Sequence, residues 1–155
     1  MGLKELVYSV LIVSASEKFN EALMSLLPEL KYNPVLVVPN AAAAKRAFAE
    51  QTFDFVIINS PLPDENGTRF AIDVCDTKET VVLLAVRAEL YAGIADEVTG
   101  HGVFSLLKPT SRSMIVTALG WMASARERLR KFEKKTLSVE EKMKEIRMVN
   151  RAKWL

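Results

Sequence analysis

The chain has 155 residues, of which 50% are hydrophobic and 26% are charged. This length predicts one domain, or one domain with an appendage, and the composition is too apolar for a disordered protein. No apolar run reaches the roughly 18 residues of a transmembrane helix, so we expect no membrane contact. The N-terminus carries no secretory signal and Cys75 is the single cysteine, so we expect a cytoplasmic protein without disulfides.

The charge is unevenly distributed along the chain. Residues 1–110 carry 9 Lys/Arg and 14 Asp/Glu, a net −5, whereas residues 111–155 carry 12 and 5, a net +7. A basic tail on an acidic body predicts either a nucleic-acid or acidic-protein partner, or a helix with a solvated basic face.

Strand-like and helix-like segments alternate along the body. Near-continuous apolar, β-branched runs predict strands, and apolar residues at helical spacing predict helices between them. Such strands are typical of a parallel sheet covered on both faces, so we predict an α/β fold, a five-stranded doubly wound parallel sheet. The expected strands are 7–13, 34–38, 54–59, 80–86 and 103–107, and the expected helices are 17–27, 41–51 after the cap Asn40, 70–75, 89–98 and a final one capped by Thr110 or Ser111.

Ligands of doubly wound sheets lie at the carboxyl ends of the strands. Two motifs follow strands in this chain, Asn-Ser-Pro-Leu-Pro-Asp-Glu-Asn-Gly at 59–67 and Gly-Val-Phe-Ser-Leu-Leu-Lys-Pro at 102–109. They are similar to the patterns D-x-x-[ML]-P-x-x-[DN]-G and G-A-x-x-[YF]-L-x-K-P, and with the first strand at 10–13 they make residues 5–125 resemble a response-regulator receiver domain. The resemblance implies a flavodoxin-like fold and a non-enzymatic role in two-component signalling.

The chain departs from the receiver pattern at the positions that carry the family's chemistry. The resemblance places the degenerate acidic pair at Ser14 and Ala15, the phospho-acceptor at Asn59, the switch positions at Ala85 and Ser105, and a retained lysine at Lys108. Mg²⁺ normally needs carboxylates, and an amide is not the nucleophile that forms an acyl phosphate. We therefore predict a pseudo-receiver that binds no metal or other cofactor and takes no phosphate at Asn59.

Three further residues lie near this site in the sequence, and one of them, Lys108, allows two interpretations. Lys108 could attract a small anion, but we favour hydrogen bonds from its ammonium to the Asn59 carbonyl and to backbone at the strand ends. Asp64 and Glu65 are expected to be solvated loop acids.

The C-terminal helix carries an apolar 3-4 repeat that runs beyond the expected body. We predict a receiver-like domain at 1–125 and a coiled-coil helix at 126–155, which pairs two chains as a homodimer. The predicted dimer seam consists of Met122, Ala125, Leu129, Phe132, Val139, Met143 and Ile146.

Flanking charges bear on the geometry of this dimer. In a parallel pair Arg128 would face Glu133, and Lys135 would face Glu140, both attractively, whereas Lys142 would face Arg147. The sequence does not decide whether the two helices of the dimer run parallel or antiparallel. Ser-Val-Glu-Glu at 138–141 fits a capping box, so the helix either continues, which we favour, or breaks near Ser138.

The last residues carry a second resemblance. Residues 141–155 end in Val-Asn-Arg-Ala-Lys-Trp-Leu and resemble the opening helix of the ANTAR domain, whose pattern is [IV]-x-x-A-K-x-x-L. Only the first of the three helices of that domain fits within these 155 residues, so we expect either a piece of a longer protein or a tail reduced to a dimerisation helix. In the first case the resemblance implies RNA binding and transcription antitermination by the full-length protein. The alternatives are an interaction adaptor with a regulatory protein partner, and a flavodoxin-like mononucleotide binder using the loop at 14–20.

Overall fold

A computed structural model gives the architecture of the chain, and it describes the backbone of residues 6–153. Within the last helix it describes side chains up to Glu133 and that of Met143.

Strands and helices alternate, and the five strands form one parallel sheet in the order β2-β1-β3-β4-β5. The predicted doubly wound α/β fold is confirmed. The elements are β1 Tyr8–Val13, α1 Glu17–Met24, β2 Tyr32–Val38, α2 Ala41–Glu50, β3 Phe55–Asn59, α3 Thr68–Cys75, β4 Val81–Arg87, α4 Ala88–Gly100, β5 Phe104–Lys108 and α5 Arg112–Lys153.

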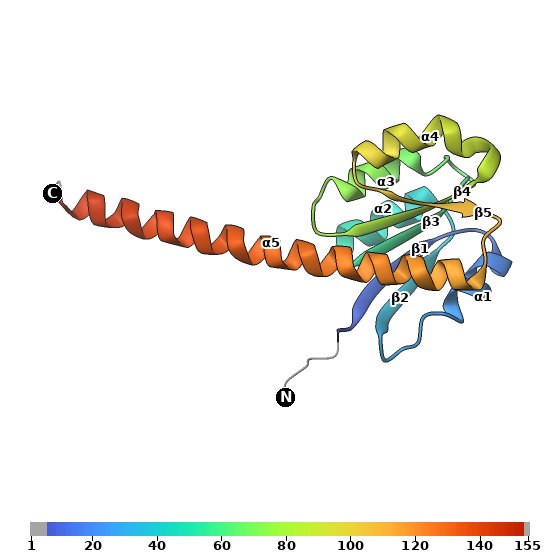
Figure 1. Ribbon diagram of the computed structural model, residues 1–155, viewed down its shortest axis with the longest axis horizontal. Helices are drawn as coiled ribbons and strands as arrows, with labels where there is room; N and C mark the ends of the chain where they lie inside the picture. The colour runs from blue at the N-terminus through green and yellow to red at the C-terminus, as the bar shows by residue number, and fades with distance from the viewer. Residues whose placement is uncertain (1–5, 154–155) are drawn as a thin grey trace.

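The sheet is covered on both faces (Figure 1). Alternate strand residues point to opposite sides, so Leu11 and Val13 join α2, α3 and α4 in one core, whereas Val10 and Ile12 join α1 and α5 in the other. Every residue of β3 is buried. This double burial explains why the strands read as unbroken apolar runs rather than as alternating ones.

Local sequence signals set most of the helix starts. The Asn40 side chain accepts a hydrogen bond from the Ala43 N–H at 2.8 Å, and Ser111 Oγ accepts one from the Met114 N–H at 3.1 Å. Both expected caps are therefore in place. Strand β2 begins at Tyr32 rather than at Pro34, and it tolerates this proline because it lies at the edge of the sheet.

Helix α5 runs without a break from Arg112 to Lys153 and projects far beyond the body (Figure 1). The capping-box sequence at Ser138 does not start a new helix. No glycine or proline follows Gly120, so nothing in the chain forces an end. No helix in the described range 6–153 combines the length and apolarity that crossing a bilayer would need.

An ionic cluster fastens α5 to the amino-terminal edge of the sheet. Asp54, which precedes β3, accepts hydrogen bonds from Arg126 Nε at 2.8 Å and Arg130 Nη2 at 3.1 Å. The Ser9 N–H donates to the same carboxylate at 3.0 Å. Contacts with the body therefore continue past Ala125, where the sequence analysis placed the end of the receiver-like domain.

A neighbouring pair extends this anchor. The Tyr8 hydroxyl donates to Glu127 Oε2 at 2.8 Å, and the Arg130 guanidinium lies 5.9 Å from the centre of the Tyr8 ring. Burial first, and then the hydrogen bond to the Glu127 carboxylate, raise the pKa of Tyr8 to about 12. The tyrosine therefore stays a neutral donor throughout the physiological range.

The Asp54 carboxyl is held in its ionised form. Burial opposes the charge, but hydrogen bonds from Arg126 and Ser9 and the charges of both arginines outweigh it, so the pKa of Asp54 lies below its ordinary value of 3.8. A carboxyl with a depressed pKa stabilises the fold fully above its unfolded pKa. That contribution is lost as the pH falls through the lower, folded value.

We expect the Asp54→Asn variant to lower the free energy of unfolding by about 2 kcal/mol at pH 7, because it leaves Arg126 and Arg130 without their shared carboxylate. The difference from the unmodified chain should shrink in the acid range below pH 3.8, the ordinary pKa of the carboxyl. Urea unfolding at several pH values measures both effects. Asp73→Asn is the matched control, since its ion pair with Arg69 is largely exposed and should contribute under about 0.5 kcal/mol.

Candidate functional site

The carboxyl ends of three strands bring together three of the residues that the receiver resemblance marks as a site. Ser14 follows β1, Asn59 ends β3 and Lys108 ends β5, and we call these three residues the strand-end site. Ser14 and Asn59 are buried, and Lys108 is partly buried. The parallel sheet places all three at one edge, as the sequence predicts.

The three side chains form a hydrogen-bonded chain. Lys108 Nζ donates to Asn59 Oδ1 and to the Ser60 carbonyl oxygen, both at 2.6 Å. Asn59 Nδ2 in turn donates to Ser14 Oγ at 3.2 Å. The favoured interpretation of Lys108 is confirmed: its ammonium is bonded to the amide oxygen and to strand-end backbone.

The charge at this site is positive. Burial, and after it the positive charge of Arg87, lower the pKa of Lys108. The strand-end site itself contains no carboxylate. Among the described residues no group of three His, Cys, Asp or Glu side chains could hold a metal ion. The residues present therefore do not fit the Mg²⁺ that the receiver resemblance implies.

The fourth strand ends one residue later than expected, at Arg87 rather than at Val86. Ala85 is fully buried within the sheet and pairs with Asn59, and Arg87 pairs with Lys108. Apolar patterning does not fix a strand end to the residue. Neither Ala85 nor Arg87 has a hydroxyl group that could hold a phosphoryl oxygen.

The receiver pattern also marks Ala15 and Ser105. Ala15 is exposed in the loop after β1, next to Ser14. Ser105 lies within β5, and its buried Oγ makes no hydrogen bond to any described residue. A serine therefore stands where the resemblance places an aromatic switch residue.

Asp64 is exposed, as expected for a loop acid, but it also has backbone partners that the sequence did not predict. Its two carboxylate oxygens accept hydrogen bonds from the Ala41 and Ala42 N–H groups at 2.9 and 3.0 Å. These backbone hydrogen bonds lower the pKa of Asp64. The carboxylate thus caps the first turn of α2, which has no acidic residue of its own. Glu65 makes an exposed ion pair with Lys45 at 3.3 Å.

The loop at 14–20 is bonded to itself, which does not fit a phosphate-binding loop. Ser14 Oγ accepts a hydrogen bond from the Ser16 N–H, and Ser16 Oγ accepts one from the Phe19 N–H. Asn20 Nδ2 donates to the Ser14 carbonyl oxygen. The backbone donors that would approach a nucleotide phosphate are in part already used.

The predicted dimer seam divides into a covered and an exposed part. Met122 has no exposed surface and lies in the body's own core, so its assignment to a dimer seam is wrong. Ala125 and Leu129 pack partly against the same core. Their helical spacing is equally suited to packing on a sheet, and a single sequence does not show where that packing ends.

The exposed part of the seam begins where α5 leaves the body. Phe132 is 71% exposed and Met143 is 51% exposed. The predicted seam positions Val139 and Ile146 belong to the helix, but their side chains lie outside the described residues. The same holds for the side chains of the ANTAR-like segment other than Met143, and Trp154 and Leu155 lie outside the described residues altogether.

Comparison with known proteins identifies the fold. A signal receiver domain of an HD domain-containing protein from Pseudomonas fluorescens superposes with a TM-score of 0.70 at 19% identity, over 86% of this chain and 96% of that one. A CheY-like receiver domain from Methylobacillus flagellatus gives 0.63 at 20% identity, over 75% and 98%. The beryllofluoride-activated receiver domain dimer of NtrC4 gives 0.65 at 21% identity, over 78% and 98%.

These similarities establish that the chain has the fold of response-regulator receiver domains. No protein-family model matches the sequence, and no curated protein does. At these identities the comparison concerns the fold alone. What the site does has to be argued from its own residues.

Proposed function

We propose that this chain is a non-enzymatic regulator of the two-component type, built on a receiver-like body that works without phosphorylation. The body pairs with a second copy through α5. In the full-length protein the dimer presents an RNA-binding module and regulates transcription antitermination. The observation that carries the proposal is the bond from Lys108 to an amide at the position where receivers place their phospho-acceptor.

The chemistry of the strand-end site supports independence from phosphate. Receivers rely on a carboxylate nucleophile and on acidic ligands for Mg²⁺, and this site offers Ser14, Asn59 and a lysine already engaged with both Asn59 and Ser60. The Asn59 amide nitrogen donates a hydrogen bond and is not a nucleophile. A cation brought to this place would meet Lys108 and Arg87 rather than opposite charge.

We expect no phosphoryl adduct when the chain is incubated with acetyl phosphate and Mg²⁺, as measured by intact mass. The matched variant carries Ser14→Asp, Ala15→Asp and Asn59→Asp together, which restores carboxylates at the three positions. It should gain Mg²⁺ affinity, seen by isothermal titration calorimetry, because carboxylates are the ligands that Mg²⁺ needs. A single phosphoryl group on the unmodified chain would contradict the proposal.

The exposed part of α5 supports dimerisation. The apolar repeat of α5 continues past the body, and a second helix is the usual partner for such a stripe. Phe132, at the edge of the body, is 71% exposed, and Met143, eleven residues further on, is 51% exposed. The beryllofluoride-activated receiver domain of NtrC4, which has a similar fold, is a dimer.

We expect the chain to sediment as a dimer at micromolar concentration in analytical ultracentrifugation. Met143→Glu should weaken the dimer at least tenfold, because it places an unpaired carboxylate in an apolar seam. Met24→Glu, at an exposed methionine on α1 that is 42% exposed, is the matched control and should leave the dimer intact. A monomer at every concentration would refute pairing through α5.

The RNA-binding part of the proposal depends on the ANTAR-like segment at 141–155 and on the basic tail. We expect the full-length gene product to bind structured RNA with an affinity that falls as salt rises, because phosphate contacts release counterions. The 155-residue chain is the control and should bind far more weakly, since it holds only the first helix of the module.

An interaction adaptor is the second candidate function. It is favoured if the full-length product shows no salt-dependent RNA binding in the same filter-binding or fluorescence assay, while pairing through α5 persists. In that case the basic tail serves a protein partner with an acidic surface.

A further inference from the structure

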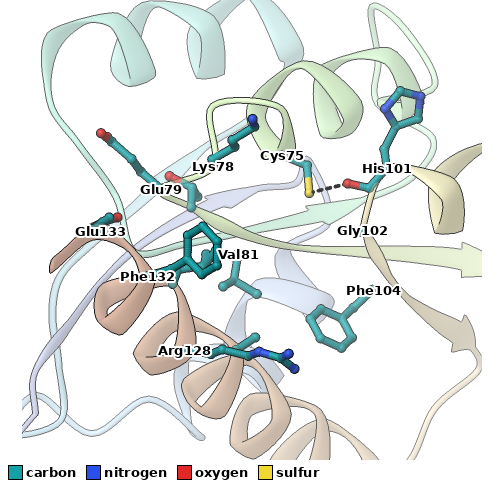
Figure 2. A pocket seen from close by; sticks show the side chains of 13 residues that line it. Cys75, Lys78, Glu79, Val81, His101, Gly102, Phe104, Arg128, Phe132 and Glu133 are labelled. Carbon is teal, nitrogen blue, oxygen red and sulfur yellow. Dashed lines mark hydrogen bonds between the residues drawn. The ribbon is translucent and has the colours of Figure 1, made fainter. Parts of the chain in front are cut away.

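A groove lies between α5 and the sheet, at the end opposite the strand-end site. It has a volume of about 1070 Å³ and its lining is mainly apolar. Figure 2 shows Phe132 and Arg128 on the α5 side and Cys75 on the opposite side, with Val81 of β4 and Phe104 of β5 between them. We call this space the α5 groove. Nothing in the proposed function so far uses it.

One wall of the α5 groove is the helix seam itself. Ala125, Leu129 and Phe132 line the groove and are also consecutive positions of the apolar 3-4 repeat. Arg128 and Glu133, which also line it, are the charges that flank this repeat. A helix that packs against Ala125, Leu129 and Phe132 therefore has to enter the mouth of the groove.

We infer that the α5 groove is occupied by the same stretch of α5 from a second copy of this chain, with the partner's Phe132 inserted between helix and sheet. The inference rests on the dimerisation proposed above and adds that the receiver-like bodies, and not the helices alone, form the interface.

Charge complementarity favours a second copy in parallel register over another occupant. In that register Arg128 of one chain faces the partner's Glu133. Within its own chain Glu133 lies 3.4 Å from Arg126, so its carboxylate would be shared between two guanidinium groups, and the same arrangement recurs across the twofold axis. The apolar centre between these charges matches an aromatic side chain. An aromatic side chain buries about 150–250 Å² when it is covered, so two insertions would supply about a fifth or more of a standard interface of about 1,600 Å².

The length of the free helix also favours this arrangement. Beyond Phe132, α5 extends for only about 30 Å, at 1.5 Å per residue. A seam of roughly three heptads is short, and the additional apolar area in the groove lies directly next to it. The groove and the exposed seam thus form one continuous surface for one partner.

The single cysteine provides the test, because Cys75 lines the groove. Its thiol donates a hydrogen bond to the His101 carbonyl oxygen at 3.0 Å, and burial first, then the charge of Asp76, raise its pKa. Its reaction rate with N-ethylmaleimide is to be measured over protein concentrations that span the dimer dissociation constant determined by ultracentrifugation.

We expect the rate to fall at least fivefold as the dimer forms. In the Met143→Glu variant the same fall in rate should require a protein concentration at least tenfold higher. In Phe132→Ala, at concentrations where the dimer still forms, the protection of Cys75 should be largely lost, because the inserted ring is gone.

The possible results separate this inference from the proposed function. If the chain dimerises and Cys75 reacts equally fast in monomer and dimer, the groove is open in the dimer and the inference is overturned, whereas pairing through α5 stands. If no dimer forms at any concentration, both fall. Full protection in a Phe132→Ala dimer would overturn the assignment of Phe132 as the inserted group.

Discussion

The contact between Lys108 and the Asn59 amide is the interaction on which the strand-end site depends. Lys108 lies at the carboxyl edge of a parallel sheet, and its ammonium donates to a neutral amide oxygen and to a backbone carbonyl oxygen, both at 2.6 Å. The ammonium is thereby bonded without a carboxylate. The strand-end site contains no acid, so it lacks the ligands that Mg²⁺ prefers, and the proposed independence from phosphate depends on this composition.

Different interactions hold helix α5 in place. Met122 and the first turns of α5 are held by burial against the sheet, and Asp54 fixes the helix further along through two arginines. Beyond that point the described side chains Phe132 and Met143 stand largely exposed. The apolar stripe of α5 thus changes from covered to exposed within one unbroken helix. The proposed dimer interface therefore begins next to the body.

Local chemistry in the sequence was enough to predict the fold and part of the site. The apolar strands, the caps Asn40 and Ser111 and the contact between Lys108 and Asn59 all follow from residues close in the chain or from motif spacing. The remaining features depend on tertiary packing. Asp64 reaches back over twenty residues to cap α2, and Asp54 meets Arg126 over more than seventy, and no periodic pattern encodes such pairs. Met122 was misassigned for the same reason, since an apolar helix position does not show whether a sheet or a second helix covers it.

The ionic cluster at Asp54 lies at the amino-terminal edge of the sheet, whereas Lys108 lies at the carboxyl-terminal edge. Helix α5 is therefore held at the edge of the sheet opposite the strand-end site, by a pair of arginines on one carboxylate, and extends about 35 Å past Arg130, at 1.5 Å per residue. For a rigid helix of that length, a tilt of about 5° at this anchor would displace the far end by about 3 Å.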